Sequence, residues 1–302
     1  MLSRFKRCCI CFAFVRMIVF YHVKLHAIVY FYHKIISVAI TSIDIIGTGN
    51  LAFNLAPALE QAGFVVNRIY GRNAQAAREL AGRLYQAAVQ SSLDFSDSLS
   101  NLFILAIADD AIEEVSRELI LPDKAVVAHT SGSKSLSVLG YTASPHIGVL
   151  YPLQTFSKVK KTGFRDVPIL IEGDNKYTRK ILTTVAGRLS RQVLAADSRQ
   201  RRIIHLAAVL AANFTNALLH QADQVLQQAG SDLDILAPLM AETLQKSFAL
   251  GPQQAQTGPA VRGDLQVLET HLEMLAGKPQ LQETYRLLSQ YILDEFYEEA
   301  GD

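Results

Sequence analysis

The sequence predicts an α/β protein in which a doubly wound parallel sheet is followed by an all-α C-terminal domain. Two observations predict this class. Apolar runs between residues 43 and 150 alternate with helical segments, which is the pattern of strand–helix–strand units around a parallel sheet. Beyond residue 197 the chain continues as Leu- and Ala-rich helical segments. A chain of 302 residues has room for two domains of ordinary size.

The stretch 43–54 predicts a dinucleotide-binding turn of the Rossmann type. An apolar run that ends at Ile46 indicates a buried strand, and a helical segment over 51–62 follows the turn. Between them lies a G-x-G-x-x-A motif, whose first glycine allows a tight turn and whose second lets the backbone approach a pyrophosphate. The small alanine lets the helix pack on the strand, and the helix N-terminus offers free N–H groups to the phosphates. The predicted cofactor contacts are therefore Gly47, Thr48, Gly49, Asn50, Leu51 and Ala52.

The residues that follow the second predicted strand, 64–70, indicate which dinucleotide binds. Folds that bind NAD usually place an acid there, which accepts a hydrogen bond from the ribose 2′-OH. This chain has Gly71-Arg72-Asn73 instead, with no acid. Arg72 can pair bidentately with a 2′-phosphate, unless it stacks on adenine or faces water, and Asn73 can bind the same phosphate or cap the next helix. The sequence therefore predicts NADP as the cofactor.

An acidic pair follows the third long apolar run, 102–108, which has the pattern of a central parallel strand. We interpret Asp109 and Asp110 as residues that cap the following helix and pair with its dipole, with a functional carboxylate pair as the alternative. Ala108 and Asp109 are then expected at the carboxyl edge of the sheet, where the cofactor would run.

Polar residues follow the strand predicted over 125–128. His129 is a candidate general acid or substrate-orienting residue, and the alternative is a structural histidine at a strand end. Ser131 and Gly132 are candidate substrate contacts, because ligands of such sheets bind at the carboxyl ends of the strands. Apolar segments within 145–156, 167–172 and 192–195 predict further strands.

The helical domain is predicted over 197–302, after a sheet domain that covers 42–196. Its first helix, 197–228, carries Asn213, Asn216 and His220 at spacings that put them on one face. Arg262 lies in a Gly/Pro/Gln-rich loop and is a candidate clamp for an anionic substrate group, unless it pairs with Asp264 as loop scaffolding.

Charge and cysteine content exclude several classes of protein. The net charge of +1 argues against a nucleic-acid-binding protein. The three cysteines all lie within residues 8–11, without a partner at the spacing of a zinc finger, so no metal site is predicted. The remainder of the chain has no thiol for a disulfide framework, which fits a cytoplasmic enzyme.

Residues 1–41 form a basic, apolar leader, with six basic residues and no acid. Three interpretations remain open: a membrane-surface anchor, a poor signal peptide, and an upstream stretch included by a misplaced start codon. We favour the third, because the first predicted strand needs nothing before about residue 36. Charged residues interrupt every apolar run before it reaches the roughly 20 residues of a membrane span, so membrane attachment is not expected. The leader is expected to lie outside the fold.

Several motifs together resemble one protein family. They are Ile-Gly-Thr-Gly-Asn-Leu-Ala at 46–52, Gly-Arg-Asn at 71–73, His-Thr-Ser-Gly-Ser at 129–133, Gly-Val-Leu-Tyr-Pro-Leu-Gln-Thr-Phe at 148–156, Pro-Ile-Leu-Ile-Glu-Gly at 168–173, and Thr-Gly-Pro-Ala-Val-Arg-Gly-Asp at 257–264. As a set they are similar to the Rossmann-like proteins with a C-terminal domain of unknown function, number 2520. That family is related to pyrroline-5-carboxylate reductase and to β-hydroxyacid dehydrogenases. The resemblance covers about residues 42–295 and implies an oxidoreductase that uses NADP or F420, without implying a substrate.

The resemblance also implies where a substrate would bind. In β-hydroxyacid dehydrogenases the helix equivalent to 197–228 faces the nicotinamide, which makes Asn213 a candidate catalytic residue. The alternative is that this polar face forms hydrogen bonds between helices or across a dimer interface. The catalytic lysine usual one turn earlier is replaced by Val209, so that chemistry does not carry over. The nicotinamide is expected to meet the substrate between His129, the segment 151–154 (Tyr-Pro-Leu-Gln) and Asn213, with Gln154 as a candidate catalytic residue.

We predict an NADP-dependent oxidoreductase that transfers a hydride to a small, anionic carbonyl or imine compound. A non-catalytic NADP-binding sensor or scaffold protein is the alternative. An F420-dependent reductase is a further one, although F420 has no ribose 2′-phosphate for Arg72 to bind. A homodimer is expected, because long helical second domains in related folds often dimerise.

Overall fold

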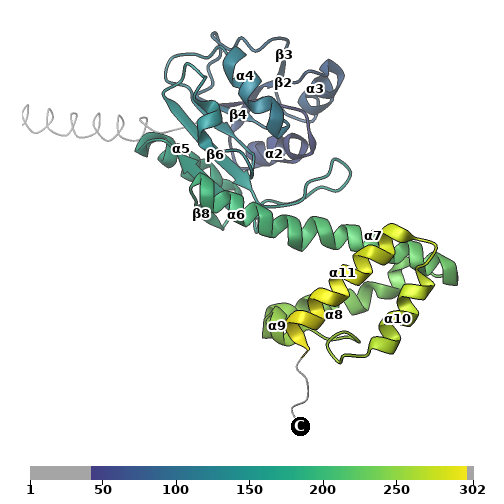
Figure 1. Cartoon of the computed structure of the whole chain (residues 1–302). Coiled ribbons are helices and arrows are strands. Elements are labelled where there is room, and N and C mark those ends of the chain that lie inside the picture. The colour runs from purple at the N-terminus through teal and green to yellow at the C-terminus, as the bar shows by residue number, and fades with distance from the viewer. Residues whose placement is uncertain (1–41, 298–302) are drawn as a thin grey trace, which may run out of the picture. The chain divides into compact units, whose positions relative to one another are not determined.

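The computed structural model describes residues 42–297, so the leader predicted over 1–41 lies outside the described residues. The chain divides into two compact units after Ala208 (Figure 1). The division predicted from the sequence lies earlier, after residue 196. Each unit is described by itself.

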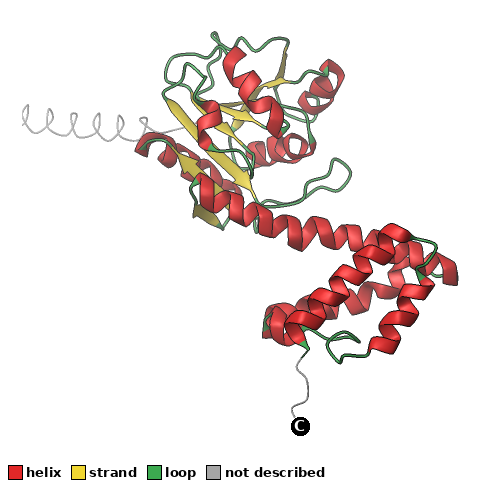
Figure 2. Ribbon diagram, viewed as in Figure 1, coloured by secondary structure: helices red, strands yellow, loops and turns green. Residues whose placement is uncertain are grey.

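The first unit is built on one eight-stranded sheet, drawn yellow in Figure 2, with strand order β3-β2-β1-β4-β5-β6-β7-β8. Neighbouring strands are parallel except β6 and β7, which are antiparallel. The predicted doubly wound parallel sheet is therefore confirmed, and its last two strands, β7 and β8, run antiparallel to the other six. The strands are β1 (Ser42–Ile46), β2 (Val65–Tyr70), β3 (Ala88–Gln90), β4 (Leu102–Leu105), β5 (Val126–His129), β6 (His146–Pro152), β7 (Ile169–Gly173) and β8 (Val193–Ala195).

Alternation along the central strands directs apolar side chains to both faces of the sheet. Ile43 and Ile45 belong to one buried cluster, whereas Ile46 belongs to another on the opposite face. The first cluster includes residues of α2 (Asn50–Gln61), α3 (Ala74–Ala81) and α5 (Lys176–Leu189), and the second includes residues of α4 (Ile112–Glu118). Helices thus cover both faces, as a doubly wound fold requires.

One acid interrupts the apolar pattern of β1. Asp44 is fully buried, and its carboxylate accepts hydrogen bonds from the Ser98 and Ser100 hydroxyls and from the backbone N–H of Arg68. Burial raises the pKa of Asp44, and these hydrogen bonds act in the opposite direction. A buried polar group without partners would destabilise the sheet, so these partners explain how an acid fits into a central strand.

The first unit ends with α6 (Ser198–Ala208), which follows β8. Its Arg201 is fully buried, which is exceptional for an arginine. The second unit is helical, as predicted (Figure 2). It contains a π-helical segment (Val209–Phe214), α7 (Thr215–Leu226), α8 (Ala237–Leu250), α9 (Pro252–Ala255), α10 (Leu265–Met274) and α11 (Pro279–Phe296).

Candidate functional site

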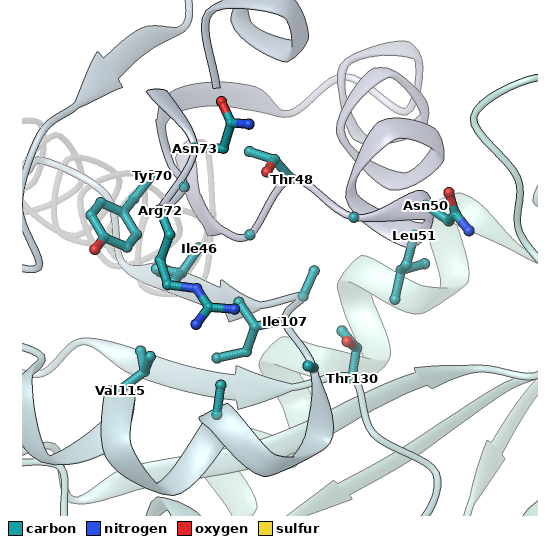
Figure 3. Close-up of a pocket in the computed structure, with 16 residues that line it drawn as sticks. Ile46, Thr48, Asn50, Leu51, Tyr70, Arg72, Asn73, Ile107, Val115 and Thr130 are labelled. Carbon is teal, nitrogen blue, oxygen red and sulfur yellow. The ribbon is translucent and has the colours of Figure 1, made fainter. Parts of the chain in front are cut away.

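A cavity of about 590 Å³ opens at the carboxyl ends of β1, β2 and β4 (Figure 3). Of the ten residues predicted to contact a cofactor, eight line it, and Ala52 and Asp109 do not. Ala52 is fully buried instead, in the cluster that packs α2 on the sheet. The lining residues are Ile46, Gly47, Thr48, Gly49, Asn50, Leu51, Tyr70, Gly71, Arg72, Asn73, Ala106, Ile107, Ala108, Ala111, Val115 and Thr130.

Gly47 and Gly49 are needed in the turn for different reasons: one for the backbone conformation, the other for the space it leaves. Gly47 has a φ of +126°, and a Cβ atom there would lie 2.0 Å from the carbonyl oxygen of Ala106. The backbone at this point therefore requires glycine. Around Gly49 a Cβ would meet no atom within 4 Å, so the absence of a side chain leaves open space at the cavity. That space is what a phosphate group needs in order to approach the backbone.

The N-terminus of α2 opens into the same cavity. No side chain caps this helix, and its first N–H to bond within the turn is that of Phe53, to the carbonyl of Gly49. The N–H groups of Asn50 and Leu51, which both line the cavity, are therefore free to bind an anion. Together with the space at Gly49, they fit the pyrophosphate of a dinucleotide.

Arg72 and Asn73 behave differently from each other. The guanidinium of Arg72 extends over the cavity toward Ile107 and Val115 (Figure 3) and forms no ion pair within residues 42–297. The side-chain oxygen of Asn73 accepts hydrogen bonds from the N–H groups of Gln75, at 3.0 Å, and Ala76, at 3.1 Å. Asn73 therefore caps α3, one of its two predicted roles, and Arg72 is the cation available to a ligand.

The acidic pair after β4 lies in the first turn of the short 3₁₀ helix that precedes α4, where carboxylates suit the helix dipole as predicted, but it does not cap the helix. Neither Asp109 nor Asp110 makes a side-chain capping bond at α4 or at the short 3₁₀ turn before it. Instead, Asp109 accepts a hydrogen bond from the Ser133 hydroxyl, and Asp110 pairs with Lys134 at 2.9 Å. The basic and hydroxyl groups of the loop after β5 attract these carboxylates, because that loop runs beside the end of β4.

His129 is fully buried at the end of β5. Its Nδ1 accepts a hydrogen bond from the N–H of Ser131 at 3.1 Å, and its Nε2 lies 3.3 Å from the carbonyl of Ser135, to which it donates in the matching tautomer. Burial, aided by the charge of Arg201, lowers the pKa of His129 to about 4. A neutral ring with both nitrogens bonded to the backbone fits the structural role better than the general-acid role.

The loop after His129 is held by its own hydrogen bonds. The Ser131 hydroxyl accepts from the N–H groups of Ser133, at 3.1 Å, and Lys134, at 3.0 Å, and Ser131 is almost fully buried. Its side chain therefore shapes the loop. Gly132, the other predicted substrate contact, leaves room for two aromatic side chains, because a Cβ there would lie 2.6 Å from His205 and 2.7 Å from Tyr151.

Two features of this region escaped the sequence analysis. The Tyr151 hydroxyl and Nδ1 of His205 lie 3.0 Å apart in a hydrogen bond. Arg201 forms an ion pair with Glu172 and donates to the carbonyl groups of Ser131 and Lys134. The partners come from separate strands, loops and helices, so no local spacing in the sequence indicates them.

Gln154 lies in the loop that follows β6 and is exposed; its side-chain oxygen accepts from the N–H of Thr155 at 2.8 Å. The base of this loop is tied to α2 by one side chain. Asn54 donates to the carbonyl of Ser157 at 2.9 Å and accepts from the N–H of Thr162 at 3.1 Å.

The remaining predicted site residues belong to the second unit. Asn213 is exposed in the π-helical segment, a geometry that is often found at functional sites. Arg262 is exposed, and the described residues show no ion pair between it and Asp264. Asp264 caps α10 instead, by accepting from the N–H of Val267. Residues 42–297 contain no group of three or more residues suited to hold a metal ion.

Comparison with known proteins places both parts of the chain. A Rossmann-like domain model matches residues 33–150, and the model of a domain of unknown function, DUF2520, matches residues 167–292. A comparison with curated proteins gives no match.

Among solved structures, a "putative NADP oxidoreductase" from Bacteroides fragilis is 39% identical, with a TM-score of 0.79; the match covers 84% of this chain and 98% of that one. A protein from Thermotoga maritima is 23% identical, with a TM-score of 0.61, covering 84% and 97%. A reductive aminase from Aspergillus terreus in complex with NADPH and ethyl-5-oxohexanoate is 15% identical, with a TM-score of 0.66, covering 86% and 97%. The last two likenesses concern the fold.

Proposed function

The chain belongs to the family of Rossmann-like proteins with a C-terminal DUF2520 domain, and we propose on this basis that it is an NADP-dependent oxidoreductase. At a coarse level this agrees with the description of the Bacteroides fragilis relative as an NADP oxidoreductase. The reaction that we propose is hydride transfer to a small, anionic carbonyl or imine compound.

The observation that carries this proposal is the cavity at the glycine turn. It combines an open approach to the backbone at Gly49, free N–H groups at the start of α2, and an arginine without an ion pair in the described chain. No acid lines it, so no carboxylate is present to accept from a ribose 2′-OH or to repel a 2′-phosphate. These groups would hold NADP, and Arg72 would bind its 2′-phosphate. The bound nicotinamide would supply the hydride chemistry.

The substrate contacts remain proposals. We propose that Arg262 binds an anionic group of the substrate and that Asn213 and Gln154 contact its reacting end. His129 is better suited to holding the loop 130–135 in shape, since both of its ring nitrogens bond to that loop. Gly132 would offer its backbone to the substrate.

A binding and turnover experiment tests the proposal. The full-length protein is titrated with NADPH and with NADH by calorimetry. Oxidation of NADPH is then followed by absorbance with pyruvate, 1-pyrroline-5-carboxylate, ethyl levulinate, and cyclohexanone with allyl amine. We expect tight binding of NADPH, weaker binding of NADH, and turnover of at least one panel compound. Binding without turnover of any compound would favour the sensor alternative, and no binding of either dinucleotide would refute the cofactor assignment.

We also propose a homodimer, because the second unit buries little apolar surface by itself. Its buried apolar residues are only Ala260, Leu268 and Leu275 in the described chain. Many large apolar side chains of the same unit are exposed, among them Phe248 at 90% and Met274 at 68%. The helical stretch Ser198–Ala229 is long and apolar enough to cross a membrane by length and composition, and its most apolar window is unburied. A second copy of this chain, packed against these residues, would remove them from water.

A further inference from the structure

A tyrosine and a histidine meet beside the loop that borders the cofactor cavity. Tyr151 is the next-to-last residue of β6, and His205 lies in α6. The Tyr151 hydroxyl is 3.0 Å from Nδ1 of His205, and the two rings cross edge to face, with their centroids 5.9 Å apart. Both side chains are partly exposed, so a ligand can reach the pair although neighbouring residues pack against it.

The pair lies at the edge of the sheet where the cavity opens. Since β6 runs parallel to β5, its carboxyl end lies at the same edge as Thr130, which lines the cavity. Gly132, two residues beyond Thr130, touches both rings: a Cβ atom there would be 2.6 Å from Nδ1 of His205. The space that a side chain would take at position 132 is therefore occupied by the tyrosine and the histidine.

Both groups keep unused hydrogen-bonding capacity. A phenol can donate one hydrogen bond and accept others, and the described residues give the Tyr151 hydroxyl one partner, Nδ1 of His205. Nε2 of His205 makes no hydrogen bond to another residue within 42–297. His129 differs in this respect, because the loop engages both of its nitrogens.

We propose that Tyr151 is the proton donor of the reductase, and that His205 resupplies its proton. This inference rests on the proposed function and identifies the general acid of the proposed reduction. Reduction of a carbonyl or imine adds a hydride to carbon and a proton to oxygen or nitrogen, and the hydride comes from NADPH. The Tyr151 O–H bond breaks as its proton passes to the substrate oxygen or nitrogen, and the Nδ1–H proton of His205 passes to the phenolate oxygen. Nε2 keeps its own proton, so the imidazolium becomes neutral imidazole, which takes up one proton from water before the next turnover.

The charges around the phenol fit a group that stays protonated until it is needed. Burial and the Asp109 carboxylate raise the pKa of Tyr151, whereas the Arg201 guanidinium acts in the opposite direction. The phenol is therefore neutral in the resting enzyme and ready to donate. Arg201 is also the cation placed to stabilise the phenolate that forms briefly.

The test compares Tyr151→Phe and His205→Ala in the full-length protein with Tyr177→Phe as the matched control. Tyr177 packs on His146, at the opposite end of β6, so its phenol is remote from the cavity edge. We expect kcat for the panel compound that the wild type reduces fastest to fall about 100-fold or more in Tyr151→Phe and His205→Ala, and to stay unchanged in Tyr177→Phe. Added imidazole should restore part of the rate of His205→Ala and none of that of Tyr151→Phe.

Two measurements without turnover accompany the rates. The dissociation constant of NADPH should be the same in all variants, because neither Tyr151 nor His205 lines the cavity. The imidazole ¹⁵N resonances of His205, measured by NMR without ligand, should shift in Tyr151→Phe as the hydrogen bond is lost.

Wild-type turnover that persists in both variants would overturn this inference and leave the proposed function intact. A folded Tyr151→Phe variant whose loss of rate is matched by weaker NADPH binding would also overturn it, since the tyrosine would then act on the cofactor site. A wild type that binds NADPH but reduces no panel compound would refute the reductase proposal itself, and the proton donor with it.

Discussion

The guanidinium of Arg201 and the carboxylate of Glu172 form an ion pair that is almost completely withdrawn from solvent, with side-chain exposures of 1% and 16%. It joins α6 to β7. The Ser198 hydroxyl donates to the same carboxylate at 2.9 Å, and Nε of Arg201 donates to the carbonyl of Ser131 at 3.2 Å. The helix that carries His205 is thereby fixed to the loop that follows His129 and contains Gly132.

Removing the arginine should therefore destabilise the first unit strongly. We expect Arg201→Met to lower the free energy of unfolding by about 3–5 kcal/mol, because it leaves a carboxylate buried without its partner. Urea denaturation followed by circular dichroism measures the effect. Arg286→Met is the control: the Arg286–Glu283 pair is exposed, so its loss should cost less than about 1 kcal/mol. A double variant, Arg201→Met with Glu172→Leu, should recover much of the loss, and a double variant as unstable as the single one would contradict this account.

Arg72 should determine the choice between NADPH and NADH. Charge-assisted hydrogen bonds contribute about 1.5–3 kcal/mol each, so Arg72→Ala should weaken NADPH binding roughly 10- to 100-fold. Binding of NADH, which has no 2′-phosphate, should hardly change. Calorimetric titration of both dinucleotides gives the comparison, with Arg78→Ala as the control, because Arg78 is exposed on α3 and does not line the cavity. Equal loss of affinity for both dinucleotides would argue that Arg72 contacts the adenine instead.

Substitution of the two glycines of the turn should have different effects: Gly47→Ala should lower stability, and Gly49→Ala should lower the affinity for NADPH. Gly47→Ala forces a Cβ against the Ala106 carbonyl at a positive φ, so we expect a loss of more than about 3 kcal/mol of unfolding free energy. Gly49→Ala should leave stability nearly unchanged, because its φ of −79° suits alanine and no atom lies within 4 Å. The Gly49 variant should nevertheless bind NADPH at least about tenfold more weakly, because the methyl group occupies the phosphate approach. Thermal melting measures the stability of both variants, and calorimetry measures their affinity for NADPH. Undiminished NADPH binding by Gly49→Ala would show that the phosphates bind elsewhere.

The buried His129 should make the protein sensitive to mild acid. Its pKa is about 4 in the folded protein and about 6.5 when unfolded, so the unfolded state binds the extra proton between these values. Stability should therefore fall as the pH is lowered from about 6.5 to 4, by up to about 3 kcal/mol from this group. Unfolding free energies measured across pH 4–8 for the wild type and for His129→Asn isolate the contribution. Identical pH dependence in the two proteins would show that His129 keeps an ordinary pKa.

The exposed apolar residues of the second unit should lie in a dimer interface. We expect light scattering to give twice the mass of one chain for the wild type and a smaller mass for a Phe248→Glu, Met274→Glu variant. Leu99→Glu is a matched control, because Leu99 is 90% exposed but belongs to the first unit. A wild type of single-chain mass would contradict the homodimer proposal.

Sequence patterns predicted the sheet and the cavity because both depend on local order. A strand, a G-x-G-x-x-A turn and a helix follow one another within 20 residues, and Arg72 is the second residue after the neighbouring strand. Eight of ten predicted cofactor contacts line one cavity for this reason. The short strand β3 has no apolar run, and the reversed direction of β7 and β8 depends on the path of a long loop, so neither feature could be predicted.

Tertiary contacts decided the features that the sequence analysis missed. Tyr151 and His205 are 54 positions apart, and Arg201 reaches Ser131 across 70. His129 has the position and residue type of an acid catalyst, yet its role depends on hydrogen bonds to Ser131 and Ser135 that a linear pattern cannot reveal. The side-chain partners of the acidic pair after β4 could not be predicted for the same reason, since they lie on another loop.

The side-chain amide of Asn54 anchors the loop after β6 on α2, so the residues between its two anchor points can be replaced. One side chain fixes both ends of the segment 157–162 to α2, while Val159 at its centre is 96% exposed. Exposed loop tips between firm anchors accept insertions most readily. Residues 159–161 can therefore be lengthened, randomised or given a fluorescent label, whereas Lys158 is to be kept because its ammonium lies over the Phe53 ring of α2. Sequences inserted at this position could change which compounds reach this edge of the sheet. A label attached there could detect their binding.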